Sequence, residues 1–259
     1  MPRGLKKHLK TLAANSLYNV GKTHGTFVIR ATEGPHKASE SIPIAILLRE
    51  RLGLALTRQE ANHICKQKNV LVDGKVKTNC RYPIGFQDVI TLPKCNKQYR
   101  ILFDTKGRMK ILPITEEEAT YKICKVRRYE LLANGIPAIV THDGRTIRYP
   151  PKEIKKNDSV KINIEQNSVE EVAPIEVGAL VMITGGRSRG RVGRIVRFEK
   201  HIGSFEIIHI RDADGNTFAT RLNNAFVIGS ENTSLITLPT DRGVRVHIMD
   251  DRENRLARQ

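Results

Sequence analysis

The sequence predicts a multi-domain α+β protein that consists of a short helical module, a central β-rich domain and a C-terminal small β-barrel. Its 259 residues suit roughly two domains or three small ones. Apolar residues at helical spacing are found at residues 43–67, and one further helix is indicated by acidic residues from Thr115 onward. From residue 98 onward, short apolar runs alternate with glycine-containing turns at the spacing of about 8–12 residues that is typical of small β domains.

Charge indicates the class of partner. The chain has 44 Lys and Arg against 27 Asp and Glu, a formal net charge of +17. Such a field favours a polyanion, with nucleic acid ahead of an anionic membrane. No apolar run approaches the roughly 18–20 residues that cross a bilayer, and no secretory signal is recognisable, so we expect a cytosolic chain with no membrane partner. Aromatic residues make up 5% and Trp is absent, so we expect charge rather than base stacking to dominate RNA affinity.

Residues 1–41 are predicted to form a basic N-terminal arm. Their basic residues are mixed with glycines, and their apolar residues hold no period long enough for a core-facing helix. We expect this arm to be disordered in isolation and to become ordered only against a partner.

Residues 42–104 are predicted to form a compact module of two helices and a hairpin. Apolar residues at three- and four-residue spacing indicate a helix over 43–52, and Gly53 ends it. Thr57 and Glu60 form a capping-box pattern that opens a second helix through Gln67. Residues 70–76 indicate two short strands around an Asp-Gly turn, and 89–92 indicate a further strand.

Residues 105–174 are predicted to form the central β-rich domain. Strands are expected over 99–103, at its border, and then over 109–114, 136–140, 146–149 and 160–164. Thr115 and the three glutamates that follow it predict one helix that extends to Arg127, because acidic residues favour the positive end of a helix.

Residues 175–245 are predicted to form a C-terminal barrel, and 246–259 a charged tail. The expected strands span 177–184, 190–198, 205–211 and 217–221. In the tail, arginines at three-residue steps are compatible with a short helix on RNA or with a solvated end.

The helical module resembles the S4-type RNA-binding domain. The matching stretches are T-R-Q-E-A from Thr57, K-N-V-L-V-D-G-K-V-K from Lys68 and D-V-I from Asp88. Members of that family present a basic surface to folded RNA, and the basic side chains here can meet on one phosphate ridge. Asn69 stands where the family usually has Gly, and Gln87-Asp88 stands where it has Gly-Asp.

Residues 177–200 resemble the KOW motif of ribosomal and transcription-elongation proteins. Glycines 185, 186, 190 and 193 permit positive φ and close backbone approach, and five arginines surround them. A nucleotide-binding P-loop is disfavoured, because Arg191 and Val192 stand where Lys and Ser or Thr are required.

Taken end to end, the chain resembles the eukaryotic and archaeal small-subunit ribosomal protein S4 (S4e) family, and more closely its eukaryotic branch. The segments T-H-D-G-R-T-I-R-Y-P from Thr141 and F-A-T-R-L-N-N-A-F-V-I-G from Phe218 link the modules in that order. The resemblance implies a structural constituent of the small (40S) subunit that binds 18S-type ribosomal RNA and neighbouring ribosomal proteins. It implies a cytoplasmic location, with a nucleolar stage during assembly, and no cofactor, metal or small-molecule substrate.

The expected RNA-binding residues are basic side chains from all of these segments. They are Arg3, Lys6, Lys7, Lys10, Lys37, Arg58, Lys66, Lys68, Lys75, Lys77, Arg81, His142, Arg145, Arg148, Arg187, Arg189, Arg191, Arg194, Arg197 and Arg221.

Two other functions share single modules with this sequence. An S4-domain RNA-modifying enzyme such as a pseudouridine synthase would carry a catalytic Asp in an Arg-Leu-Asp triplet, which this chain lacks. His142 and Asp143 are adjacent in sequence, and adjacent residues on a strand point to opposite faces, so the pair is poorly placed to act together. A hairpin turn at Asp143-Gly144 explains the acid better, and no catalytic residue is expected. A KOW-type transcription elongation factor would carry an NGN-type domain, for which there is no counterpart. The four cysteines form no C-x-x-C pair and are expected to be reduced thiols.

Overall fold

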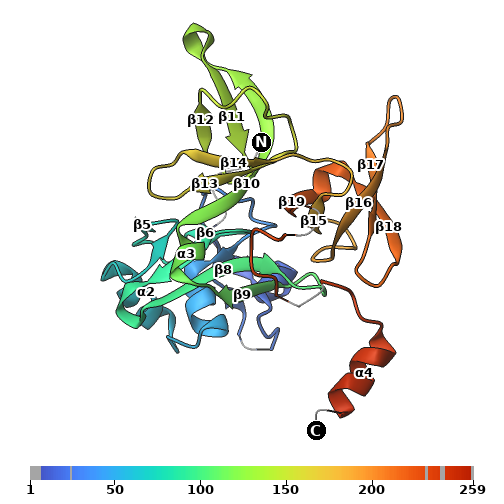
Figure 1. The fold of residues 1–259 in the computed structure, drawn as a ribbon. Helices are drawn as coiled ribbons and strands as arrows, with labels where there is room; N and C mark the ends of the chain where they lie inside the picture. Colours follow the sequence, from blue (N-terminus) through green and yellow to red (C-terminus); the bar gives the residue numbers. More distant parts are fainter. Residues whose placement is uncertain (1–6, 24, 231–232, 240–242, 258–259) are drawn as a thin grey trace. The chain divides into compact units, whose positions relative to one another are not determined.

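The computed structural model describes residues 7–23, 25–230, 233–239 and 243–257. The chain divides into two compact units, each of which is described by itself. Unit 1 comprises Met1–Leu102 and Arg108–Pro174, and unit 2 comprises Phe103–Gly107 and Ile175–Gln259. Figure 1 labels their strands and helices. Within the described residues, no helix is long and apolar enough to span a membrane.

The described part of the N-terminal segment contains paired strands and buried residues, whereas the sequence predicted an arm without a core. The strands β1 (Leu9–Lys10) and β2 (Phe27–Val28) pair antiparallel. Leu17 and Tyr18, on a short 3-10 turn, are buried, and the turn is capped by the side chain of Asn15, which accepts from the backbone N–H of Leu17. Sequence periodicity missed these anchors because they lie on a three-residue turn rather than on a repeating helical face.

The two helices of the S4-type module form as expected. After β3 (Ile42–Pro43), the first helix comprises α1 (Ile44–Ile46) and a π-helical turn over Leu47–Arg51. Thr57 and Glu60 form the predicted capping box at the start of α2 (Arg58–Lys66). Ala61 and Cys65 are the buried residues of that helix.

A five-stranded sheet completes the module, in the order β5-β4-β7-β8-β9. Its strands are β4 (Leu71–Val72), β5 (Lys75–Val76), β7 (Val89–Leu92), β8 (Lys97–Phe103) and β9 (Met109–Pro113); β6 (Pro83–Ile84) pairs separately with β3. The predicted hairpin turn is present, with positive φ at both Asp73 and Gly74. The strand β9 joins this sheet although it lies beyond the boundary expected at residue 104.

The helix predicted from Thr115 to Arg127 is wrong beyond its first turn. The helix α3 spans only Glu116–Ala119, and an 11-residue strand, β10 (Tyr121–Leu131), follows it. The glutamates cap one turn, as expected from their charge. The residues that follow are rich in aromatic and β-branched types, which favour a pleated strand.

The strand β10 is the central strand of a second five-stranded antiparallel sheet, in the order β12-β11-β10-β13-β14. Its other strands are β11 (Pro137–Thr141), β12 (Thr146–Arg148), β13 (Ser159–Asn163) and β14 (Val169–Ala173). Cys124, Val126, Ile139, Val160 and Ile162 form its buried core. The sequence did not predict β14, whose polar residues 170–171 weaken its apolar pattern.

Unit 2 contains a third five-stranded antiparallel sheet, in the order β18-β17-β16-β15-β19. The strands are β15 (Leu180–Ile183), β16 (Val192–Glu199), β17 (Ile207–Arg211), β18 (Thr217–Arg221) and β19 (Ala225–Gly229). The strands β18 and β19 are its edges, and no pairing joins them among the described residues, so a closed barrel is not confirmed.

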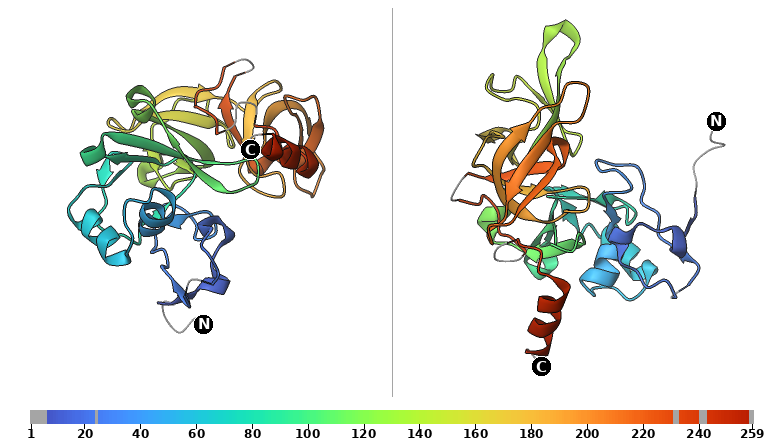
Figure 2. Two further views of the ribbon diagram at one scale, coloured as in Figure 1. Left: turned by 90° about the horizontal axis from the view of Figure 1, so that it is seen from below. Right: turned by 90° about the vertical axis from the view of Figure 1, so that its right-hand side faces the viewer.

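The charged tail forms the helix α4 (Ile248–Leu256). Figures 1 and 2 show α4, in dark red, projecting away from the sheet of unit 2. Its Asp251 accepts a hydrogen bond of 2.6 Å from Lys106, and it also pairs with Arg255 one turn later. The tail thus contains a short helix, and a position of this helix on RNA stays a prediction.

Candidate nucleic-acid interface

The helical module exposes most of the basic residues predicted to contact RNA. Arg58 and Lys66 lie on α2, Lys68 follows that helix, and Lys75 lies on β5; all four are exposed. Lys77 is half-buried, with its ammonium 4.5 Å from the centre of the Tyr82 ring. Exposed ammonium and guanidinium groups without a tight internal partner are suited to phosphate contact.

The two departures from the S4-type pattern have distinct structural outcomes. The left-handed residue after α2 is Lys68, with φ of 62°, one position before Asn69. Gln87, where the family usually has Gly, also has positive φ, at 70°. Its fully buried side chain accepts a 3.0 Å hydrogen bond from Arg100, which offsets part of the cost of that conformation.

The N-terminal segment contributes exposed lysines and one internal anchor. Lys7, Lys10 and Lys37 are exposed, and Arg3 and Lys6 lie outside the described residues. Arg81 instead donates from Nε to the carbonyl oxygen of Arg30, at 3.0 Å. This bond fastens the N-terminal segment to the S4-type module, and the RNA contact expected of Arg81 stays a prediction.

The glycine-rich loop between β15 and β16 is shaped by close backbone approach. Gly190 has φ of +84°, and a Cβ at that position would overlap the carbonyl oxygen of Asp104. Only glycine avoids both the strained conformation and the collision. The turn that the four glycines predicted therefore packs against residues 103–107, which belong to the same unit.

The five arginines around this loop do not share one environment. Arg187, Arg194 and Arg197 are exposed, although Arg197 also lies 2.6 Å from Glu199. Arg189 is half-buried, 5.2 Å from the centre of the Phe103 ring. Arg191 pairs with the buried carboxylate of Asp212 and lies over the Phe218 ring. In this structure the guanidinium of Arg191 is thus engaged within unit 2, by Asp212 and the Phe218 ring.

Two further arginines keep exposed positions. Arg148 is the last residue of β12. Arg221, at the end of β18, stacks 4.0 Å from the centre of the Phe205 ring. Arg211, which is exposed at the end of β17, was not among the residues predicted to bind RNA. Its position at the end of a predicted strand could have indicated that it is exposed.

His142 is held by the backbone on both of its ring nitrogens. Nδ1 accepts from the backbone N–H of Lys125 at 3.2 Å, and Nε2 lies 3.3 Å from the carbonyl oxygen of Phe86. These partners assign a neutral ring with the proton on Nε2. Burial lowers the pKa of His142 to about 4. We therefore assign His142 a structural role instead of the predicted RNA contact.

Arg145 also makes internal hydrogen bonds with every nitrogen of its guanidinium group. Its guanidinium donates to Asp143 at 2.8 Å, to Asp73 at 2.9 Å and to the side chain of Asn167 at 3.0 Å. All three of its nitrogens thus have internal acceptors, so this predicted RNA contact is also reassigned to the fold.

Beside Arg145 lies a buried ionic cluster centred on Lys122. Its ammonium is 2.8 Å from Asp73, 2.6 Å from Asp88 and 3.0 Å from Asp143. Burial lowers the pKa of Lys122, but the three carboxylates outweigh this and raise it well above its usual value. For Asp88, burial acts in the opposite direction and raises the pKa. The effects of His36 and Lys122 are larger, and they hold the pKa of Asp88 far below its usual range. Both shifts favour the charged forms of Lys122 and Asp88.

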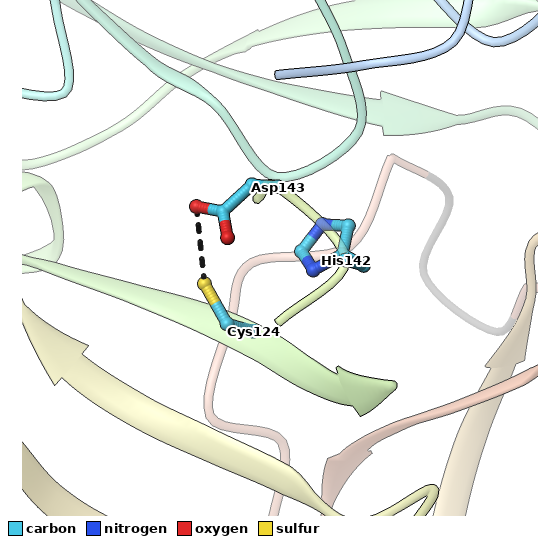
Figure 3. Close-up of side chains that lie close together, drawn as sticks. All are labelled: Cys124, His142 and Asp143. Atoms are coloured by element: carbon cyan, nitrogen blue, oxygen red, sulfur yellow. Dashed lines mark hydrogen bonds between the residues drawn. The ribbon is translucent and has the colours of Figure 1, made fainter. Parts of the chain in front are cut away.

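Cys124, His142 and Asp143 lie close enough together to resemble a metal site (Figure 3). However, Cys124 donates to Asp143 at 3.5 Å, Asp143 is bonded to Lys122 and Arg145, and both nitrogens of His142 face backbone groups. An ammonium already supplies the positive charge that a metal would bring. We assign the group to the ionic cluster.

An S4-type module, two β-rich segments and exposed basic residues throughout define a modular RNA-binding protein. Comparison with known families is consistent along the chain. The S4 domain matches residues 43–90, Ribosomal family S4e matches 95–169, the RS4NT (NUC023) domain matches 3–39, and 40S ribosomal protein S4 C-terminus matches 212–259.

Relatives and a solved structure agree with these matches. The chain is 49% identical over 257 residues to the small ribosomal subunit proteins eS4A, eS4B and eS4C of Schizosaccharomyces pombe, which covers 99% of this chain and 98% of theirs. The crystal structure of the 30S ribosomal protein S4e from Thermoplasma acidophilum has a TM-score of 0.66 at 28% identity, covering 76% of this chain and 99% of that one. The chain belongs to the ribosomal protein S4e family.

Proposed function

We propose that the protein is a structural constituent of the small (40S) ribosomal subunit, where it binds and stabilises ribosomal RNA beside neighbouring ribosomal proteins and so supports subunit assembly and translation. The observation that carries this function is the 49% identity to eS4 proteins over nearly the whole of both chains. The net charge of +17 supplies the attraction to RNA. This role places the protein in the cytoplasm, and a nucleolar stage during assembly belongs to the same proposal.

The family consists of structural ribosomal proteins, so no enzymatic activity is assigned. The comparison with the eS4 relatives also argues against both alternative functions. An RNA-modifying enzyme or an elongation factor would match one module of this chain, whereas the alignment with the eS4 relatives covers 99% of it.

The domain organisation is part of the proposal. We divide the chain into an N-terminal segment (1–41), an S4-type domain (42–104), a central β-rich domain (105–174), a KOW-type SH3-like domain (175–245) and a tail (246–259). The sheet order of β15–β19 and the glycine-rich loop after β15 support the KOW-type assignment. The pairing of β9 with β8 favours extending the S4-type domain to residue 113.

The proposed RNA contacts are the exposed basic residues from the predicted set. They are Lys7, Lys10, Lys37, Arg58, Lys66, Lys68, Lys75, Arg148, Arg187, Arg194, Arg197 and Arg221. Lys77 and Arg189 are half-buried against aromatic rings and stay predictions, as do Arg81, Arg3 and Lys6.

Binding of the full chain to a transcript of the small-subunit ribosomal RNA tests this proposal. The affinity for this transcript should exceed the affinity for transfer RNA when the two RNAs are compared at equal total phosphate charge. The affinity for the transcript should also fall steeply between low and physiological salt, because bound phosphates release counterions. Equal affinity for both RNAs, or an affinity insensitive to salt, would argue against it.

A further inference from the structure

Arg194 and Arg211 stand directly opposite each other on the neighbouring strands β16 and β17. Both residues are exposed. Among the described residues, neither guanidinium takes part in an ion pair or side-chain hydrogen bond. Like charges at directly opposed positions of an antiparallel pair repel each other and destabilise the sheet. The isolated protein thus keeps an electrostatic cost that an external anion would remove.

These two arginines line a groove on unit 2, with a volume of about 780 Å³. Its wall includes Gly178, Gly193 and Gly215, so part of its surface is bare backbone. At Gly193 a Cβ would lie 2.5 Å from the carbonyl oxygen of Arg211 and 2.6 Å from Cγ2 of Ile210. Glycine is therefore required for the two strands to hold the arginines in this arrangement.

The residues that line the groove are better suited to bind a phosphate than a nucleobase or a metal ion. Among the described residues of its lining there is no aromatic ring on which a base could stack. The one acid among those residues is Asp212, whose buried carboxylate is already paired with Arg191. The two guanidiniums opposite each other are the charge left without a partner, and guanidinium binds phosphate oxygens with bidentate geometry.

We propose that this groove binds a backbone phosphate of ribosomal RNA between Arg194 and Arg211. The proposal rests on the proposed function and adds to it a defined phosphate site, including Arg211, which lay outside the predicted set. An occupied site places one negative charge between two facing positive charges and so reduces their repulsion, which links RNA binding to the stability of this sheet.

The test uses the full chain with a double substitution, Arg194→Gln and Arg211→Gln. Its matched control, Arg127→Gln with Arg128→Gln, removes two charges from exposed positions of β10, where Arg128 lies 2.6 Å from Glu130. Affinity for the small-subunit ribosomal RNA transcript is measured at several salt concentrations, and thermal midpoints are measured without RNA.

The groove variant should bind several-fold more weakly than the control, and its salt slope should fall by about one unit, because each phosphate that is no longer bound lowers the slope by about one and the groove holds one phosphate. Its thermal midpoint without RNA should rise by roughly 1–3 °C, because the repulsion is removed. A merely structural pair of arginines would give the opposite sign, with a lower midpoint, and that result would overturn the proposal.

Affinity and slope equal to those of the control would also overturn it while leaving the proposed function intact, since wild-type binding would be unaffected. If the groove variant instead bound RNA normally but no longer bound a neighbouring acidic ribosomal protein, the site would be a protein contact and the proposal would be wrong. Failure of the wild-type chain itself to bind the transcript would overturn the proposed function together with this site.

Discussion

The ammonium nitrogen of Lys122 lies 2.6 Å from Oδ1 of Asp88, and both side chains are almost completely buried. Asp73 and Asp143 complete its environment. One lysine on β10 thereby joins the hairpin turn after β4, the residue before β7 and the turn after β11. Within unit 1, the S4-type module and the central sheet are therefore connected by buried ion pairs.

Replacement of Lys122 by Met should cost about 3–5 kcal/mol of unfolding free energy, because it leaves buried carboxylates without their cation. Chemical denaturation at neutral pH measures this. The exposed Lys155, replaced by Met, serves as the control and should change the free energy by less than about 0.5 kcal/mol. Equal effects of the two substitutions would contradict the ionic account of this cluster.

Stability of unit 1 should fall as pH decreases from about 7 to about 4. Burial lowers the pKa of His142 to about 4, whereas the unfolded chain has an ordinary value near 6.5. In this window the unfolded state takes up the proton first, so the stabilisation is complete above about 6.5 and is lost as pH falls toward 4. The loss should reach roughly 2–3 kcal/mol.

His142→Gln keeps a donor and an acceptor but does not titrate, so its stability should depend less on pH between 7 and 4.5. The carboxylates of Asp88 and Asp143, whose pKa values are held below their usual range, affect stability only at lower pH. Parallel pH profiles for the wild type and this variant would show that His142 is not the group that titrates.

The local features of the S4-type module could be predicted from sequence, whereas the ionic cluster could not. The capping box of α2 and the Asp73-Gly74 turn depend on residues within a few positions of each other. Lys122, in contrast, meets partners 34 and 49 positions away. The prediction of a helix through residue 127 also concealed it, since a lysine on a helix would be expected to face solvent.

Gly190→Ala should destabilise unit 2 much more than Gly203→Ala. Both glycines have positive φ, but a Cβ at Gly203 meets open space, whereas at Gly190 it overlaps the backbone of Asp104. We expect about 1 kcal/mol at Gly203 from conformation alone, and more than about 3 kcal/mol at Gly190, where backbone must move as well. Similar thermal midpoints for the two variants would show that residues 103–107 do not pack against this loop.

Arg191→Gln should destabilise the fold by about 3 kcal/mol, because it leaves the buried carboxylate of Asp212 without its partner. The exposed Arg187→Gln should leave the unfolding free energy within about 0.5 kcal/mol of the wild type. Thermal denaturation of each single variant makes the comparison. If Arg191→Gln were as stable as Arg187→Gln, the pairing with Asp212 would contribute nothing.

The arginines of this loop could be predicted only in part from the sequence. Their spacing around four glycines predicted a loop with high positive charge, and the structure has that loop. Their separation into an internal ion pair, a residue beside Phe103 and exposed groups depends on Asp212 and Phe103, which are distant in sequence from the loop. A variant that changes Arg187, Arg189 and Arg191 together would therefore lose stability as well as charge.

Cosedimentation of the intact protein with ribosomal subunits tests the central claim most directly. Cell lysate is fractionated on a sucrose gradient, and the small-subunit fraction is washed with salt of increasing concentration. The protein should migrate with small subunits and stay bound after a moderate wash, since many phosphate contacts act together. Migration as free protein, or with polymerase or transfer RNA alone, would contradict its assignment as a constituent of the small ribosomal subunit.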